Sequence, residues 1–202
     1  MSRAGEESLA RICSQCAKCC RISDVQLFPE EAVAVADEGR KLGLNISIKP
    51  NYWFYDEISR KRLVLFYSIQ LVDGNCPFLR GGLCAIYSRR PLICRCFPYV
   101  PEEIDFVFDN ENKQITVDVR YATSVVCPLA RSASLLNHRR YVLEFEYKLR
   151  SYLFLLSTLW RKGVVELRKE GGGEYQNLYE LLSKHFPFLE VFHRKNRREK
   201  GC

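Results

Sequence analysis

The stretch CSQCAKCC, residues 13–20, is the part of the sequence around which we expect the fold to form. It holds four of the chain's ten cysteines in the pattern C-x2-C-x2-C-C. Two residues between cysteines allow one turn of backbone to bring both sulfurs to a single metal. Cys13, Cys16 and Cys19 are therefore expected to converge. Cys20, whose side chain points in another direction, would bind a second centre or reach the first from the opposite side.

A second group of cysteines in the middle of the chain supplies the further thiolates that the first motif requires. Cys76-Pro77 and Cys127-Pro128 pair each cysteine with a proline, as at the end of ferredoxin-type cluster motifs, and proline stiffens the chain beside the sulfur. Cys84 follows Gly81-Gly82, where we expect the backbone to approach a metal closely. Cys94 follows a short turn that contains a proline.

Eight of the ten cysteines are candidate metal ligands, and Cys96 and Cys202 are left out. The eight are Cys13, Cys16, Cys19, Cys20, Cys76, Cys84, Cys94 and Cys127. They are enough for two four-ligand sites, or for one cluster with further thiols beside it.

Composition describes a soluble globular chain that needs no disulfides to fold. Its 202 residues are 47% hydrophobic, and the mean hydropathy is −0.20. The N-terminus lacks the apolar run of a signal peptide, and the longest apolar run, residues 152–160, is too short to span a bilayer. We therefore expect a cytoplasmic protein in which clustered, reduced cysteines bind metal or catalyse. Structural disulfides, as in intracellular proteins of hyperthermophiles, are the alternative.

The formal net charge of +7 counts every cysteine as neutral. A four-thiolate Zn²⁺ or [4Fe-4S]²⁺ site carries a charge of about −2, so two such sites would lower +7 to about +3. Arg90 and Arg95 would tune a cluster or bind an anionic substrate, or else neutralise thiolates and bond loop carbonyls; we favour the second role. Basic residues near the cysteines thus weaken any argument from charge to nucleic acid.

The secondary-structure signals predict an α+β fold. We expect a small, loop-rich, cysteine-lined core with a short antiparallel sheet, braced by C-terminal helices. A helix is predicted from Pro29 to near Leu42, with Gly43 as its cap. A strand is predicted at residues 62–71, and a hairpin is predicted from strands 104–108 and 114–121.

The C-terminal third has helical periodicity. A buried stripe at residues 142–160 predicts a helix that ends near Gly163. We expect Gly171–Gly173 to form a flexible joint, and Tyr175–Phe186 to form a last amphipathic helix. These signals predict a cysteine-cluster metal-binding domain over residues 1–130 and a helical region with a basic tail over residues 131–202.

Together, the two cysteine motifs resemble the YkgJ-like CxxCxxCC cysteine-cluster family, a zinc- or iron-chelating domain. Residues 13–20 match the motif that names the family, and residues 84–98 (CAIYSRRPLICRCFP) resemble its second signature, C-x-I-Y-x-x-R-P-x-x-C-R-x-F-P. Cys76 and Cys127 lie where the family's remaining cysteines are expected, and the resemblance spans residues 13–130. Cys96 occupies a variable position of the signature, so it is a spare thiol, an alternative ligand or a redox partner of Cys94.

The resemblance implies metal binding but no settled reaction. A related domain occurs in flagellin lysine methylases, where an iron-sulfur cluster is implicated, and this favours iron over zinc. The leading hypothesis is an intracellular iron-sulfur protein, with a [4Fe-4S] cluster, that acts in electron transfer or as a cluster-dependent oxidoreductase or modifying enzyme. The alternative is a structural zinc-binding module that mediates protein or nucleic-acid interaction. Whether the metal performs chemistry or only holds loops together stays open.

Other features of the sequence add little to these two hypotheses. His138, His185 and His193 lie far from any cysteine, and we do not expect them to bind the metal. The basic tail, residues 193–202, could contact nucleic acid or an acidic partner, but we favour a solvated terminus. No Ser-His-Asp set, P-loop, Rossmann fingerprint or radical-SAM C-x3-C-x2-C spacing is present.

Overall fold

The structure is a computed structural model that describes residues 16–22, 25–131 and 136–189 of the chain. Its largest sheet is built around β3 (Lys61–Ile69), whose apolar sequence is buried almost throughout, as in an interior strand. β2 (Ile48–Asp56) pairs antiparallel with one side of β3, and β8 (Leu167–Arg168) pairs with β2. The other side of β3 pairs antiparallel with β1 (Val25–Leu27) and parallel with β9 (Glu174–Asn177).

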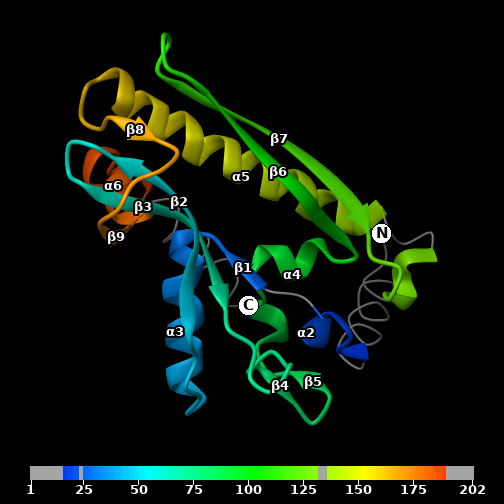
Figure 1. Cartoon of the computed structure of the whole chain (residues 1–202). Helices are drawn as coiled ribbons and strands as arrows, with labels where there is room; N and C mark the ends of the chain where they lie inside the picture. The colour runs from blue at the N-terminus through cyan, green and yellow to red at the C-terminus, as the bar shows by residue number, and fades with distance from the viewer. Residues whose placement is uncertain (1–15, 23–24, 132–135, 190–202) are drawn as a thin grey trace.

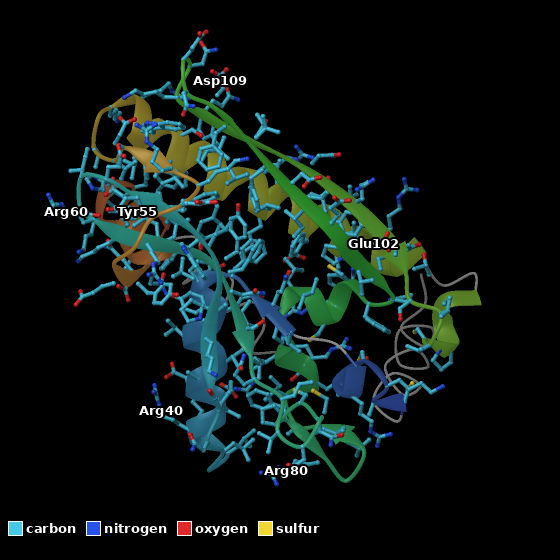
Figure 2. All side chains as sticks on the ribbon, viewed as in Figure 1. Arg40, Tyr55, Arg60, Arg80, Glu102 and Asp109 are labelled. Atoms are coloured by element: carbon cyan, nitrogen blue, oxygen red, sulfur yellow. The ribbon has the colours of Figure 1, made fainter. Side chains whose placement is uncertain are left out.

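A separate two-stranded hairpin confirms the predicted one and extends it at its open end. Its strands are β6 (Tyr99–Asp109) and β7 (Gln114–Thr123). At the tip, the carboxylate of Asp109 accepts a hydrogen bond from the backbone N–H of Asn112 at 2.9 Å. Figure 2 shows Asp109 at this tip and Arg80 at the opposite end of the molecule.

Helix α5 (Leu136–Arg161) lies along this hairpin and confirms the predicted long helix (Figure 1). Its buried stripe is the predicted one, with Phe145, Leu149, Tyr152, Leu153, Leu156 and Trp160 in the core. Ser157 is a polar residue on this buried side of the helix. Its hydroxyl is satisfied there, because it accepts a hydrogen bond from the backbone N–H of Ile115, on β7, at 2.9 Å. No helix in the described ranges is long and apolar enough to cross a membrane.

Short elements away from the hairpin tip carry five of the eight described cysteines (Figure 1). They are α2 (Cys19–Ile22), β4 (Leu79–Arg80), β5 (Leu83–Cys84), the 3-10 helices η1 (Tyr87–Arg89) and η2 (Pro128–Arg131), and α4 (Leu92–Cys96). Helix α3 (Pro29–Lys41) packs beside them and confirms the predicted helix, with Gly43 at φ 66° just beyond its end. The architecture is therefore the predicted α+β class, with short antiparallel sheets and C-terminal helices.

Two hydrophobic clusters hold these parts together. The larger one joins the sheet, the hairpin, α4, α5 and α6 (Leu178–His185). The smaller one lies beneath the cysteines and includes Leu27, Val35, Ile69 and Phe78. The larger cluster contains residues from both sides of residue 130, and the predicted division of the chain at that point stays a prediction.

The structure corrects two predictions in the C-terminal part. Tyr175 lies in β9, not in a helix, because residues 174–177 pair with β3. Helix α6 begins only after Asn177, whose side chain accepts a hydrogen bond from the backbone N–H of Tyr179 at 2.9 Å. Gly171–Gly173 is a packed segment and not a flexible joint: a Cβ at Gly173 would lie 2.2 Å from the carbonyl oxygen of Arg60.

Candidate metal centre

Five cysteines from separate segments line one cavity of about 300 Å³. The five are Cys19, Cys20, Cys76, Cys84 and Cys94. They come from α2, from the loop before β4, from β5 and from α4. Apolar side chains form most of the remaining wall, among them Val25, Ile69, Phe78, Ile86, Ile93 and Phe97, and Arg90 adds a positive charge. The cavity is therefore a thiol-rich site with largely apolar walls.

The first motif reaches this cavity through α2. Ala17 is buried with a φ of 51°, and the backbone N–H of Cys20 donates to its carbonyl at 3.1 Å, which starts the helix at Cys19. Both Cys19 and Cys20 line the cavity. The structure thus brings the thiols of Cys19 and Cys20 to one cavity. That Cys20 binds a second centre, or reaches the first from the opposite side, stays a prediction.

A backbone hydrogen bond joins the first motif to the central cysteines. The N–H of Cys76 donates to the carbonyl of Cys20 at 2.7 Å, so the loop before β4 is fixed against α2. Cys84 follows on β5, opposite Leu79 on β4. That Gly81-Gly82 brings the backbone close to a metal stays a prediction. Both glycines have positive φ and form the β4–β5 turn, and no atom lies within 4 Å of a Cβ built at either one.

Helix α4 points its two cysteines in opposite directions. Residues two positions apart on a helix lie about 200° apart around its axis. Cys94 therefore lines the cavity, whereas Cys96 is 0% exposed and packs in the larger hydrophobic cluster. The structure places Cys96, which was left out of the candidate ligands, away from the other thiols.

The remaining candidate cysteines lie beside the cavity or outside the described residues. Cys127 is buried and packs with Cys19 and Phe97, but it does not line the cavity. Cys16 is half-buried, one residue before Ala17. Cys13 lies outside the described residues, as do Cys202 and His193. None of the eight described cysteines is in a disulfide.

The cavity thiols affect one another's acidity. A hydrogen bond to Cys20, followed by burial, raises the pKa of Cys19 well above its ordinary value. The hydrogen bond with Cys19 lowers the pKa of Cys20, but the hydrogen bond with Cys76, burial and neighbouring thiols raise it more, to about 12. The hydrogen bond from Cys20 lowers the pKa of Cys76. Burial, and then the neighbouring thiols, raise the pKa of Cys94 well above its ordinary value.

The raised pKa values of Cys19, Cys20 and Cys94 describe thiols that keep their protons until a cation arrives, whereas the pKa of Cys76 is lowered. A bound metal ion deprotonates the thiols that coordinate it, so metal binding would reverse the effect of burial. Thiolates are the ligands that zinc and iron-sulfur clusters select. Within the described ranges, no three His, Cys, Asp or Glu side chains are placed as they would be around a single metal ion. The chemistry of the donors nevertheless fits a thiolate-bound metal or cluster.

The comparisons with known proteins agree with this chemistry. No curated protein and no solved structure matches the chain. One family model matches residues 12–122, under the name CxxCxxCC and the description "Putative zinc- or iron-chelating domain". The matched residues are more than half of the chain and include the cavity cysteines, the loops between them and most of the β6–β7 hairpin. The chain therefore belongs to the CxxCxxCC family of metal-chelating domains.

Proposed function

We propose that the metal of this protein is an iron-sulfur cluster, of the [4Fe-4S] type, held by the cysteines around the cavity. The observation that carries the proposal is the number of thiols that surround a cavity of this size. Five cysteines line it, one more than a tetrahedral zinc site or a [4Fe-4S] cluster needs, and Cys127 packs directly behind Cys19.

The size of the cavity favours a cluster over a single zinc ion. Four thiolates that bind one Zn²⁺ at about 2.3 Å lie roughly 3.8 Å apart and leave no space between them. The cavity of about 300 Å³ is roughly ten times the ~30 Å³ that a water molecule occupies in the liquid. A cluster that brings its own sulfide ions fills such a space better than one ion does.

The ligands would come from the eight candidate cysteines, of which one [4Fe-4S] cluster needs four; the others would serve a second centre or lie beside the cluster. Cys19, Cys20, Cys76, Cys84 and Cys94 are the proposed ligands within the described part of the cavity. Cys13, Cys16 and Cys127 complete the proposed set, because the first two precede α2 and the third packs beside it. A bound cluster would supply reversible one-electron transfer.

We infer that this chemistry serves electron transfer, or an oxidoreductase or modifying reaction that depends on the cluster. Cys19, Cys20 and Cys84 are only half-buried, so the cavity lies close enough to the surface for electrons to be exchanged. Its apolar walls limit water near the thiols, and solvent exposure is one of the factors that set a cluster's potential.

The test is purification without oxygen, followed by visible absorption and by analysis of iron, sulfide and zinc. The proposal predicts a brown protein with iron and inorganic sulfide in about equal amounts. A colourless protein with one equivalent of zinc would overturn the proposed cluster and support the structural zinc module instead. The absence of all three elements would overturn both.

A further inference from the structure

Arg90 is the basic residue that the fold builds into the wall of the thiol cavity. It is half-buried and lines the cavity between η1 and α4. Its Nε donates a hydrogen bond to the carbonyl of Tyr87 at 3.1 Å, and its guanidinium carbon lies 3.8 Å from the centre of the Tyr87 ring. These contacts limit the positions that the guanidinium can take, which is the condition for a fixed electrostatic effect.

Arg90 shares its cavity with cysteines from both parts of the site. Arg90 lines the same cavity as Cys19 and Cys94. Cys19 belongs to the first motif and Cys94 to the second. Arg90 is therefore close to the point where the two motifs meet.

The neighbouring arginines have other roles. Arg89 is exposed, and its guanidinium forms an ion pair with Glu38 of α3 at 2.7 Å. The Nε of Arg95 donates to the carbonyl of Arg90 at 2.8 Å, and its charge acts on Cys96, which lies in the core. Arg95 thus holds the backbone of Arg90, whereas Arg89 faces α3. Arg89 is a matched control for Arg90, because it has the same charge one residue away.

We propose that Arg90 offsets the negative charge of the occupied thiolate site and so sets the reduction potential of the cluster. The effect on potential rests on the proposed function, because only a redox cluster has a potential to set. Reduction adds one electron to a site that is already negative, and a nearby cation stabilises the reduced form more than the oxidised form. Net charge around a cluster is one of the factors that determine its potential.

The experiment compares the wild type with Arg90→Gln, Arg90→Lys and Arg89→Gln, all purified without oxygen and titrated with redox mediators. We expect Arg90→Gln to shift the reduction equilibrium at least tenfold toward the oxidised form, which is a midpoint about 59 mV more negative for a one-electron couple. Arg90→Lys keeps the charge and should recover at least half of the shift in potential. Arg89→Gln should change the equilibrium less than twofold.

A second measurement tests the role of Arg90 even if a variant is purified without a cluster. The metal-free proteins are titrated with Co²⁺, whose binding to thiolates is followed by visible absorption. We expect Arg90→Gln to bind Co²⁺ at least tenfold more weakly than Arg89→Gln, because thiolate charge is then left without its cation. Equal behaviour of the two variants in both measurements would overturn the role of Arg90. A wild type without iron or sulfide would instead contradict the proposed cluster, and the Co²⁺ comparison would still decide the role of Arg90.

Discussion

The doubled cysteine of the first motif is explained by where α2 begins. Cys19 and Cys20 occupy the first turn of this helix, about 100° apart around its axis. This angle allows both side chains to reach the wall of one cavity. The carbonyl of Cys20 also accepts the backbone N–H of Cys76, so the same residue fixes the second segment of the site. Cys20 therefore acts through its backbone as well as its thiol.

The two cysteines of α4 provide a matched pair for identifying ligands. We expect Cys94→Ala to lower metal affinity by more than about 100-fold, because even the loss of a group that only supports a ligand costs 10- to 100-fold. Cys96→Ala should keep the metal and lower the free energy of unfolding by about 1 kcal/mol, as for a small core truncation. Metal content after purification and competition with a chelator measure both effects. Metal loss in Cys96→Ala would contradict the proposed set of eight ligands.

At the scale of elements, α4 is held in place by a carboxylate from α3. Glu31 Oε1 accepts the backbone N–H of Leu92 at 2.9 Å, and Oε2 accepts that of Phe28 at 3.1 Å. The side chain therefore caps the first turns of α4 and of its own helix. Because α4 carries Cys94, the orientation of this thiol depends on Glu31.

We expect Glu31→Ala to weaken metal binding roughly tenfold, since each lost hydrogen bond costs about 1 kcal/mol and α4 must then be ordered by the metal. Asp37→Asn is the control, because the side chain of Asp37 is 44% exposed and its ion pair with Arg40 stays within α3. Chelator competition compares the two variants with the wild type. If both lose the same affinity, the capping of α4 is not what positions Cys94.

The triple glycine between α5 and α6 gives a second test at this scale. Gly173 has a φ of 138°, and a Cβ there would lie 2.2 Å from the carbonyl oxygen of Arg60 at the β2–β3 turn. Gly173→Ala should therefore lower the free energy of unfolding by about 1–3 kcal/mol. Gly172→Ala is the control, since no atom lies closer to its Cβ than Arg62 Nη2 at 4.0 Å. Urea unfolding should show Gly172→Ala close to the wild type; equal destabilisation would contradict the close packing of Gly173 against Arg60.

For the whole molecule, the sequence predicts those features that depend on local signals. The α5 stripe, the turn at Asp109 and the proline at the start of α3 each determine their element without help from distant residues. Strand β2 has no such signal, because Pro50 and Asn51 interrupt it, and its pairing with β3 shifts register there. β9 forms only because β3 lies beside residues 174–177. Long-range pairing of this kind cannot be inferred from local periodicity.

The candidate site, too, could be predicted from the sequence only where local signals determine it. The spacing of the cysteines predicts ligand candidates, and Cys96 is left out because it occupies a variable position of the second signature. It does not predict that Cys19 and Cys20 line one cavity, because this depends on where α2 starts and on the hydrogen bond to Cys76. The Glu31 cap was missed because an acidic residue in the first turn of α3 is already explained by the helix dipole.

One partly buried ion pair joins α3 to α5 and links residues far apart in the chain. Glu30 of α3 has a side chain that is 9% exposed; it forms an ion pair with Lys148 and accepts a hydrogen bond from the hydroxyl of Tyr152. The ammonium of Lys148 also lies 4.6 Å from the centre of the Phe28 ring. Burial alone would raise the pKa of Glu30, but the charge of Lys148 and the hydrogen bonds lower it below its ordinary value. Burial would lower the pKa of Lys148, but Glu30 raises it.

These shifts determine how the pair contributes to stability as the pH changes. A lowered carboxyl pKa stabilises the fold above the unfolded value of about 4.3, and this contribution is lost as the pH falls through the folded value. A raised ammonium pKa stabilises the fold below the unfolded value of about 10.4, and this contribution is lost as the pH rises through the folded value. The ion pair of Glu30 and Lys148 therefore contributes its full stabilisation of the fold between about pH 4.3 and about pH 10.4.

We expect Glu30→Gln to lower the free energy of unfolding by about 1–3 kcal/mol at neutral pH, because it leaves the largely buried Lys148 without its partner. The difference from the wild type should start to shrink below about pH 4, where Glu30 of the unfolded chain becomes protonated, and should be smallest once the pH has fallen through the lowered pKa of folded Glu30, which then resembles glutamine. Glu103→Gln is the control: Glu103 pairs with Arg120 on the exposed face of the hairpin, and its loss should cost less than about 1 kcal/mol. Urea unfolding of the metal-free proteins across this pH range measures each difference. A Glu30→Gln effect that is no larger than that of the control, or that does not change with pH, would show that this ion pair does not hold α3 against α5.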